Sequence, residues 1–105
     1  MVRMIRWDGK RWYAGGLSLG GHEVSFLFAV MGRPVVSARE MLEIFWPDPD
    51  DEPDRSELVV RVVATTLRRK LSPLGWTICN RRGLRQDDPR AGYRLVKLSE
   101  DRMAA

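Results

Sequence analysis

The sequence predicts an α+β fold: a short amino-terminal antiparallel sheet, then three helices, then a carboxy-terminal β-hairpin. Three observations predict it. An Asp8-Gly9 turn between two aromatic-rich segments is a strong hairpin signal. Apolar residues at helical spacing lead into the basic run at 67–71, and alternating segments at 76–80 and 93–98 should pair as strands. A chain of 105 residues can build one modest core.

The amino-terminal sheet and the first helix should occupy residues 4–31. Segments 4–7 and 11–13 flank the Asp8-Gly9 turn and are expected to pair. Gly20-Gly21 opens the helix, and Glu23 supplies half of a capping box, because glycine cannot supply the hydroxyl. The expected core-facing stripe of this helix is Val24, Leu27, Phe28 and Met31.

The second helix has a complete start signal. Ser37-Ala38-Arg39-Glu40 is a capping box, and Val36 and Met41 occupy the positions of a hydrophobic staple. Pro47 ends the helix. The side chains expected to face the core or its edge are Met41, Leu42, Phe45 and Trp46.

The third helix is predicted within residues 54–71 and has two different faces. The expected core stripe is Val60, Ala64, Leu67 and Leu71. The expected outer face is Arg61, Val62, Thr65, Thr66, Arg68 and Arg69. Small, polar and guanidinium groups on an exposed helix suit the major groove of DNA.

From Leu17 to Leu95 the motifs occur in an order that resembles the OmpR/PhoB-type winged-helix effector domain of bacterial response regulators. The matching pieces are Leu19 and Glu23, the stretch 35–42, Phe45-Trp46, Leu67-Arg68-Arg69-Lys70-Leu71, Arg82-Gly83 and Gly92-Tyr93-Arg94-Leu95. The resemblance implies a winged helix-turn-helix whose third helix recognises DNA. The last two pieces adjoin in the family but are separated here by residues 84–91, so the wing carries an insertion.

Positive charge is concentrated in the second half of the chain. Residues 1–54 hold 6 basic and 9 acidic side chains, whereas residues 55–105 hold 12 basic and 5 acidic ones. Such a field favours binding to phosphates. The residues expected to contact DNA are Arg61, Val62, Thr65, Thr66, Arg68, Arg69, Lys70, Arg81, Arg82, Arg85 and Arg90. The alternative for the wing tip, residues 81–90, is a solvated loop with ordinary surface charges.

An acidic, proline-broken loop at 48–54 separates the second and third helices. In the resembling family this turn can touch RNA polymerase, which implies partner contacts by Asp50, Asp51 and Glu52. The alternative is that the acids only favour the start of the third helix through its dipole, with Asp54 and Glu57 as its capping box.

The sequence contains few signals for metal binding, catalysis or membrane insertion. His22 is the only histidine and is expected to face solvent, so no metal site is predicted, and Cys79 is expected to be a packed small hydrophobe. With no nucleophile elbow and no glycine-rich phosphate loop, we expect neither an enzyme nor a cofactor. No apolar run is long enough to span a membrane, and a cytoplasmic location is expected.

The sequence therefore predicts a sequence-specific regulator of transcription that binds double-stranded DNA, with residues 1–98 as the domain and 99–105 as a flexible tail. It is expected to act without a receiver domain or phosphorylation control, and to need a second copy or a protein partner for useful affinity. The alternative is a winged-helix adaptor that binds RNA polymerase or another regulator and contacts DNA weakly.

Overall fold

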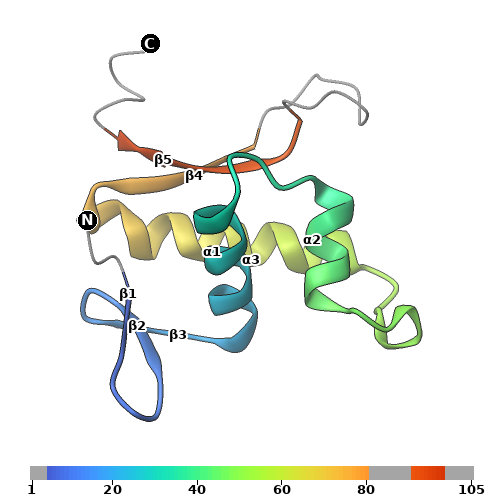
Figure 1. The fold of residues 1–105 in the computed structure, drawn as a ribbon, viewed down its shortest axis with the longest axis horizontal. Helices are drawn as coiled ribbons and strands as arrows, with labels where there is room; N and C mark the ends of the chain where they lie inside the picture. Colours follow the sequence, from blue (N-terminus) through green and yellow to red (C-terminus); the bar gives the residue numbers. More distant parts are fainter. Residues whose placement is uncertain (1–4, 81–90, 99–105) are drawn as a thin grey trace.

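The computed structural model describes residues 5–80 and 91–98 and has the predicted α+β architecture. A three-stranded antiparallel sheet comes first, formed by β1 (Ile5–Trp7), β2 (Trp12–Ala14) and β3 (Leu17–Leu19). The helices are α1 (Gly21–Gly32), α2 (Ala38–Phe45) and α3 (Ser56–Leu71). The antiparallel hairpin is β4 (Trp76–Asn80) with β5 (Tyr93–Lys97), and short 3-10 turns occupy η1 (Pro49–Asp51) and η2 (Ser72–Leu74). In Figure 1 the hairpin runs above α3, and α3 packs against β4 as well as against α1 and α2.

The predicted turn at Asp8-Gly9 closes the first hairpin. The Asp8 carboxylate accepts hydrogen bonds from the backbone N–H groups of Arg11 and Lys10, each at 2.8 Å, and these bonds lower the pKa of Asp8. Gly9 has a φ of 101°, in the region that favours glycine. Trp7 therefore pairs with Trp12 across a tight connection.

The buried face of α1 differs from the predicted stripe. Its buried residues are Phe26, Leu27 and Val30, so only Leu27 of the predicted set is fully buried. Phe28 and Met31 are each 45% exposed. Because α1 is apolar around most of its circumference, spacing alone could not select the core face. Tertiary contacts select it: the Phe26 ring meets Tyr93 edge-on at 5.0 Å between ring centroids.

The start of α2 is confirmed as a capping box. The Ser37 hydroxyl accepts a hydrogen bond from the Glu40 N–H at 3.0 Å, and the Ser37 N–H donates to the Glu40 carboxylate at 3.3 Å. These bonds with Ser37 lower the pKa of Glu40. Arg33 forms an ion pair with the same carboxylate and so joins the end of α1 to the start of α2.

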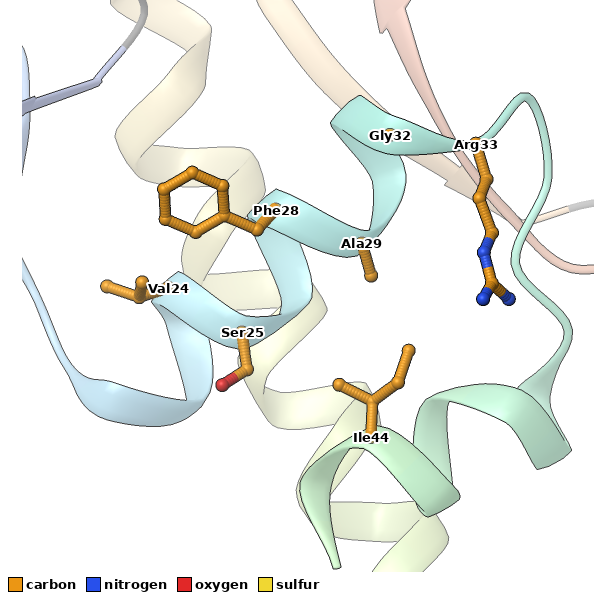
Figure 2. A pocket seen from close by; sticks show the side chains of 7 residues that line it. All are labelled: Val24, Ser25, Phe28, Ala29, Gly32, Arg33 and Ile44. Carbon is orange, nitrogen blue, oxygen red and sulfur yellow. The ribbon is translucent and has the colours of Figure 1, made fainter. Parts of the chain in front are cut away.

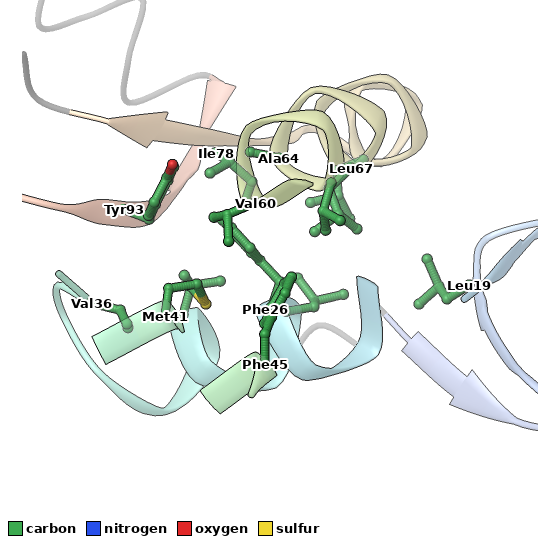
Figure 3. Packing of buried hydrophobic residues seen from close by; sticks show 14 of the residues in the cluster. Leu19, Phe26, Val36, Met41, Phe45, Val60, Ala64, Leu67, Ile78 and Tyr93 are labelled. Atoms are coloured by element: carbon green, nitrogen blue, oxygen red, sulfur yellow. The ribbon is translucent and has the colours of Figure 1, made fainter. Parts of the chain in front are cut away.

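The predicted core stripe of α3 is confirmed. Val60, Ala64, Leu67 and Leu71 are each at most 2% exposed and belong to the hydrophobic core, and Figure 3 shows the first three of them within the cluster. The start of α3 corrects a second expectation, since Arg55 is the N-cap residue and no side chain caps the helix. The Ser56 N–H donates to the Pro53 carbonyl, so Asp54 lies in a turn before the helix and the Asp54–Glu57 capping box does not form.

Candidate nucleic-acid interface

The outer face of α3 carries two rows of side chains. At about 100° per residue, Arg61, Thr65 and Arg68 form the row nearer the hairpin. Leu58, Val62 and Arg69 form the second row, where Leu58 is 49% and Val62 57% exposed. Arg69 is also exposed, whereas Thr66 is partly buried. The helix thus presents guanidinium groups and small apolar groups together.

A polar hollow of about 320 Å³ lies between α3 and the hairpin; we call it the α3–hairpin hollow. The residues that line it are Arg61, Ala64, Thr65, Arg68, Asn80 and Tyr93. Arg68 fastens the two elements together, because its Nε donates a hydrogen bond to the Ile78 carbonyl of β4 at 2.7 Å. The Thr65 hydroxyl donates to the Arg61 carbonyl at 3.0 Å, within the helix.

Two arginines on this face have guanidinium groups without a partner in the described part of the chain. Within residues 5–80 and 91–98, no hydrogen bond or ion pair involves the guanidinium of Arg61 or Arg69. Arg61 also borders a second hollow, on the side of the acidic residues Glu52, Asp54 and Glu57. The field of α3 is therefore most positive towards the hairpin and towards its carboxyl-terminal end.

The hairpin is held against the helices by a pair of backbone hydrogen bonds. The Val36 N–H donates to the Tyr93 carbonyl at 3.0 Å, and the Tyr93 N–H donates to the Val36 carbonyl at 2.8 Å. Val36 lies in the connection between α1 and α2, so these bonds join that connection to the first residue of β5. Together they fix the hairpin beside the exposed face of α3.

This arrangement is similar to a solved structure, the DNA-binding domain of the response regulator AdeR in complex with an intercistronic region. The two share 22% sequence identity with a TM-score of 0.60, over 92% of this chain and 98% of that one. The chain has a winged-helix fold. Neither a protein-family model nor a curated protein matches the sequence. In winged-helix terms, α3 is the candidate recognition helix and β4–β5 is the wing.

Lys70 was expected to contact DNA, but in the structure its side chain binds other parts of the domain. The Lys70 Nζ lies 2.7 Å and 3.0 Å from the Glu23 carboxylate oxygens and 2.8 Å from the Ser18 carbonyl oxygen. The side chain is only 21% exposed. Nine residues at about 100° each place Lys70 opposite Arg61 on the helix. Lys70 therefore anchors α3 to β3 and α1, and we leave it out of the candidate interface.

The remaining predicted site residues of the winged helix fall into two groups. Asp50, Asp51 and Glu52 are all exposed, in and just after η1. The Asp48 carboxylate accepts a hydrogen bond from the Asp50 N–H at 3.0 Å and so shapes this turn. The predicted wing-tip residues lie outside the described part of the chain; they are Arg81, Arg82, Arg85 and Arg90. The paired strands that carry the tip are confirmed.

The structure adds Asn80 to the candidate interface and leaves Leu58 exposed on the same face as Val62. Asn80 ends β4 beside Arg68, and its place directly before Arg81 was the available signal. Leu58 precedes Val62 by one helical turn, and this spacing already places the two residues on one face in the sequence. Both side chains are exposed, so both are available to a ligand of the winged helix.

Another hollow, between α1 and α2, does not suit nucleic acid. Figure 2 shows its lining: Val24, Ser25, Phe28, Ala29, Gly32, Arg33 and Ile44. The one guanidinium in this lining, Arg33, is paired with Glu40. In the described part of the chain there is also no group of three or more potential metal ligands, and no helix is long and apolar enough to cross a membrane.

Proposed function

We propose that the chain is a sequence-specific regulator of transcription that binds double-stranded DNA. One observation carries the proposal: the helix at the recognition-helix position of a winged helix presents Arg61 and Arg69, which have no hydrogen-bond or ion-pair partner among the described residues, and Arg61 lies beside the wing. The similar domain of AdeR was solved in complex with an intercistronic region. Here α3 enters the major groove, and the wing lies on the neighbouring phosphates or the minor groove.

The chemistry of the α3 face fits both parts of DNA recognition. Arginine binds guanine edges or phosphates in two-point contacts, and apolar groups such as Val62 pack against thymine methyl groups. The wing-tip arginines of residues 81–90 extend the contact to flanking DNA in this proposal. Since a single winged helix covers limited DNA surface, two copies on repeated half-sites are proposed to supply useful affinity.

The first test measures how binding depends on salt. Binding to a random-sequence duplex is expected to weaken steeply as salt rises, because Lys and Arg displace counterions from phosphates. Arg61→Ala should reduce the slope of log affinity against log salt by about one unit. Arg11→Ala, which removes the same charge from the exposed connection between β1 and β2, is the matched control and should leave the slope unchanged. If the wild-type protein fails to bind duplex DNA even at low salt, the proposal is wrong.

A specific observation keeps the adaptor function as a second candidate. Leu58 and Val62 are exposed side by side on α3, and an apolar pair of this kind can dock on a protein. The exposed acids Asp50, Asp51 and Glu52 offer a separate contact, which we propose is made with RNA polymerase. This loop lies at the opposite end of the molecule from the amino-terminal sheet (Figure 1).

The acidic loop can be tested apart from DNA binding. Changing Asp50, Asp51 and Glu52 together to serine should leave DNA affinity unchanged or slightly raise it, because negative charge near phosphate is removed. Transcription in vitro per bound protein should change. Glu43→Ser, another exposed acid, on α2, is the control and should change neither quantity. Unchanged output from the triple variant would mean that the loop only connects the helices.

A further inference from the structure

We infer that the α3–hairpin hollow is a binding site for one phosphate group of the DNA backbone. The inference rests on the proposed function and deepens it, because it assigns the contact with one backbone phosphate to this particular hollow. The hollow lies where the recognition helix and the wing meet. A duplex that fills its major groove with α3 brings the adjoining backbone towards this junction.

The lining has the chemistry of an anion site. Arg61 and Arg68 contribute two positive charges, and no carboxylate is among the described residues that line the hollow. Asn80 adds an amide that can donate hydrogen bonds. Guanidinium groups bind phosphate oxygens in two-point, charge-assisted contacts, which are roughly twice as strong as neutral hydrogen bonds.

Arg68 is held in position before any ligand arrives. Its Nε donates to the Ile78 carbonyl at 2.7 Å, which fixes the plane of the guanidinium against β4. No hydrogen bond from its two terminal nitrogens to another described residue is present, so they are available to a phosphate. A donor that is already ordered loses less conformational entropy on binding than a free surface side chain.

The hollow is large enough for a hydrated anion. Its volume of about 320 Å³ is far above the roughly 10–15 Å³ that a cavity needs to hold one water. A phosphate group can therefore enter while some water stays. Asn80 is exposed at the mouth, at the end of β4, whereas Ala64 is buried. The site is thus open to a backbone that passes along the surface.

The main test places a carboxylate at the mouth without changing the shape of the side chain. Asn80→Asp is expected to weaken binding to a random-sequence duplex on the order of tenfold, because the new charge repels the phosphate. Gly16→Asp is the matched control. Gly16 is exposed, and a Cβ added there would meet no atom within 4 Å, so this position accepts the same charge far from the hollow. At about 0.15 M salt, a distant surface charge is screened, and the control should stay within about twofold of wild type.

A second measurement identifies the phosphate itself. In a duplex to which the protein binds at one position, backbone phosphates are replaced one at a time by neutral methylphosphonates. Wild type should lose affinity at the phosphate that enters the hollow, whereas Asn80→Asp should lose none there or bind more tightly. Thermal melts of each variant establish that it is folded. Arg68→Lys keeps the charge but lacks the planar guanidinium that makes two-point contacts. Its affinity for duplex should therefore lie between those of wild type and Asn80→Asp.

The outcomes separate this inference from the proposed function. If Asn80→Asp and Gly16→Asp bind duplex equally while wild type still shows salt-dependent binding, the hollow holds only water and the inference is overturned, but the proposed function stands. A wild-type protein that binds no duplex overturns both. Two results together support the inference. Duplex affinity falls in Asn80→Asp but not in Gly16→Asp, and replacing one particular phosphate by a methylphosphonate weakens binding of the wild type but not of Asn80→Asp.

Discussion

Replacing Gly92 with alanine is expected to destabilise the fold by roughly 3 kcal/mol, the range in which backbone strain and overpacking combine. Gly92 has a φ of 137°, a conformation that residues with a Cβ rarely adopt. A Cβ added there would lie 2.4 Å from the Val36 carbonyl oxygen, which is the acceptor of the Tyr93 N–H. The substitution therefore has to displace the Val36 carbonyl and so disturb the pair of hydrogen bonds that holds the wing to the helices.

Two other glycines separate the contributions to this cost. Gly75 also has a positive φ, 85°, but has open space around an added Cβ, so Gly75→Ala should cost about 1 kcal/mol from conformation alone. Gly16 has neither constraint, and Gly16→Ala should be close to neutral. Urea unfolding followed by circular dichroism gives all three free energies. Equal costs for the substitutions at Gly92 and Gly75 would show that the wing adjusts to the crowded Cβ.

Local signals in the sequence predicted the parts of the fold that depend on neighbouring residues. The Asp8-Gly9 turn and the Ser37–Glu40 capping box each involve residues at most three apart, and the structure contains both. The core stripe of α3 was also predictable, because Val60, Ala64, Leu67 and Leu71 share one face, whereas the outer face carries Arg61, Thr65 and Arg69 beside the exposed Leu58 and Val62. These elements were sufficient to predict the order and the class of the fold.

The errors arose where distant contacts decide the structure. Nothing in the local spacing shows that Phe26 rather than Phe28 turns towards Tyr93, which is far along the chain. Lys70 is 47 positions from its partner Glu23, so no local signal indicates their ion pair. The basic run that ends in Lys70 was therefore interpreted as a uniformly charged, exposed surface. In the structure the run divides: Arg69 is exposed, Arg68 holds β4, and Lys70 is paired. The sequence therefore indicated α3 as the candidate interface but could not assign a role to each charge.

This division of the basic run makes Arg69 the residue expected to read sequence. Arg69 is exposed in the same row as Val62, and the described part of the chain supplies no partner for its guanidinium. Arg69→Ala should weaken binding to a preferred site, selected from a random library, by about 1–3 kcal/mol, the worth of a two-point contact with guanine. Binding to random duplex should weaken much less, so the ratio of the two affinities measures the loss.

The lysine variant at the same position separates charge from geometry. Arg69→Lys keeps the positive charge, so its salt slope should match wild type, but it lacks the planar fork and should lose preference for the selected site. Thr65→Val is the matched control on this face, because the Thr65 hydroxyl already donates its proton to the Arg61 carbonyl at 3.0 Å and cannot also donate to a base. Its effect on preference should be smaller than that of Arg69→Ala. If instead both Arg69 variants lower affinity for selected and random duplexes by the same factor, Arg69 contacts phosphate, and the base-reading groups of α3 have to lie elsewhere on its exposed face.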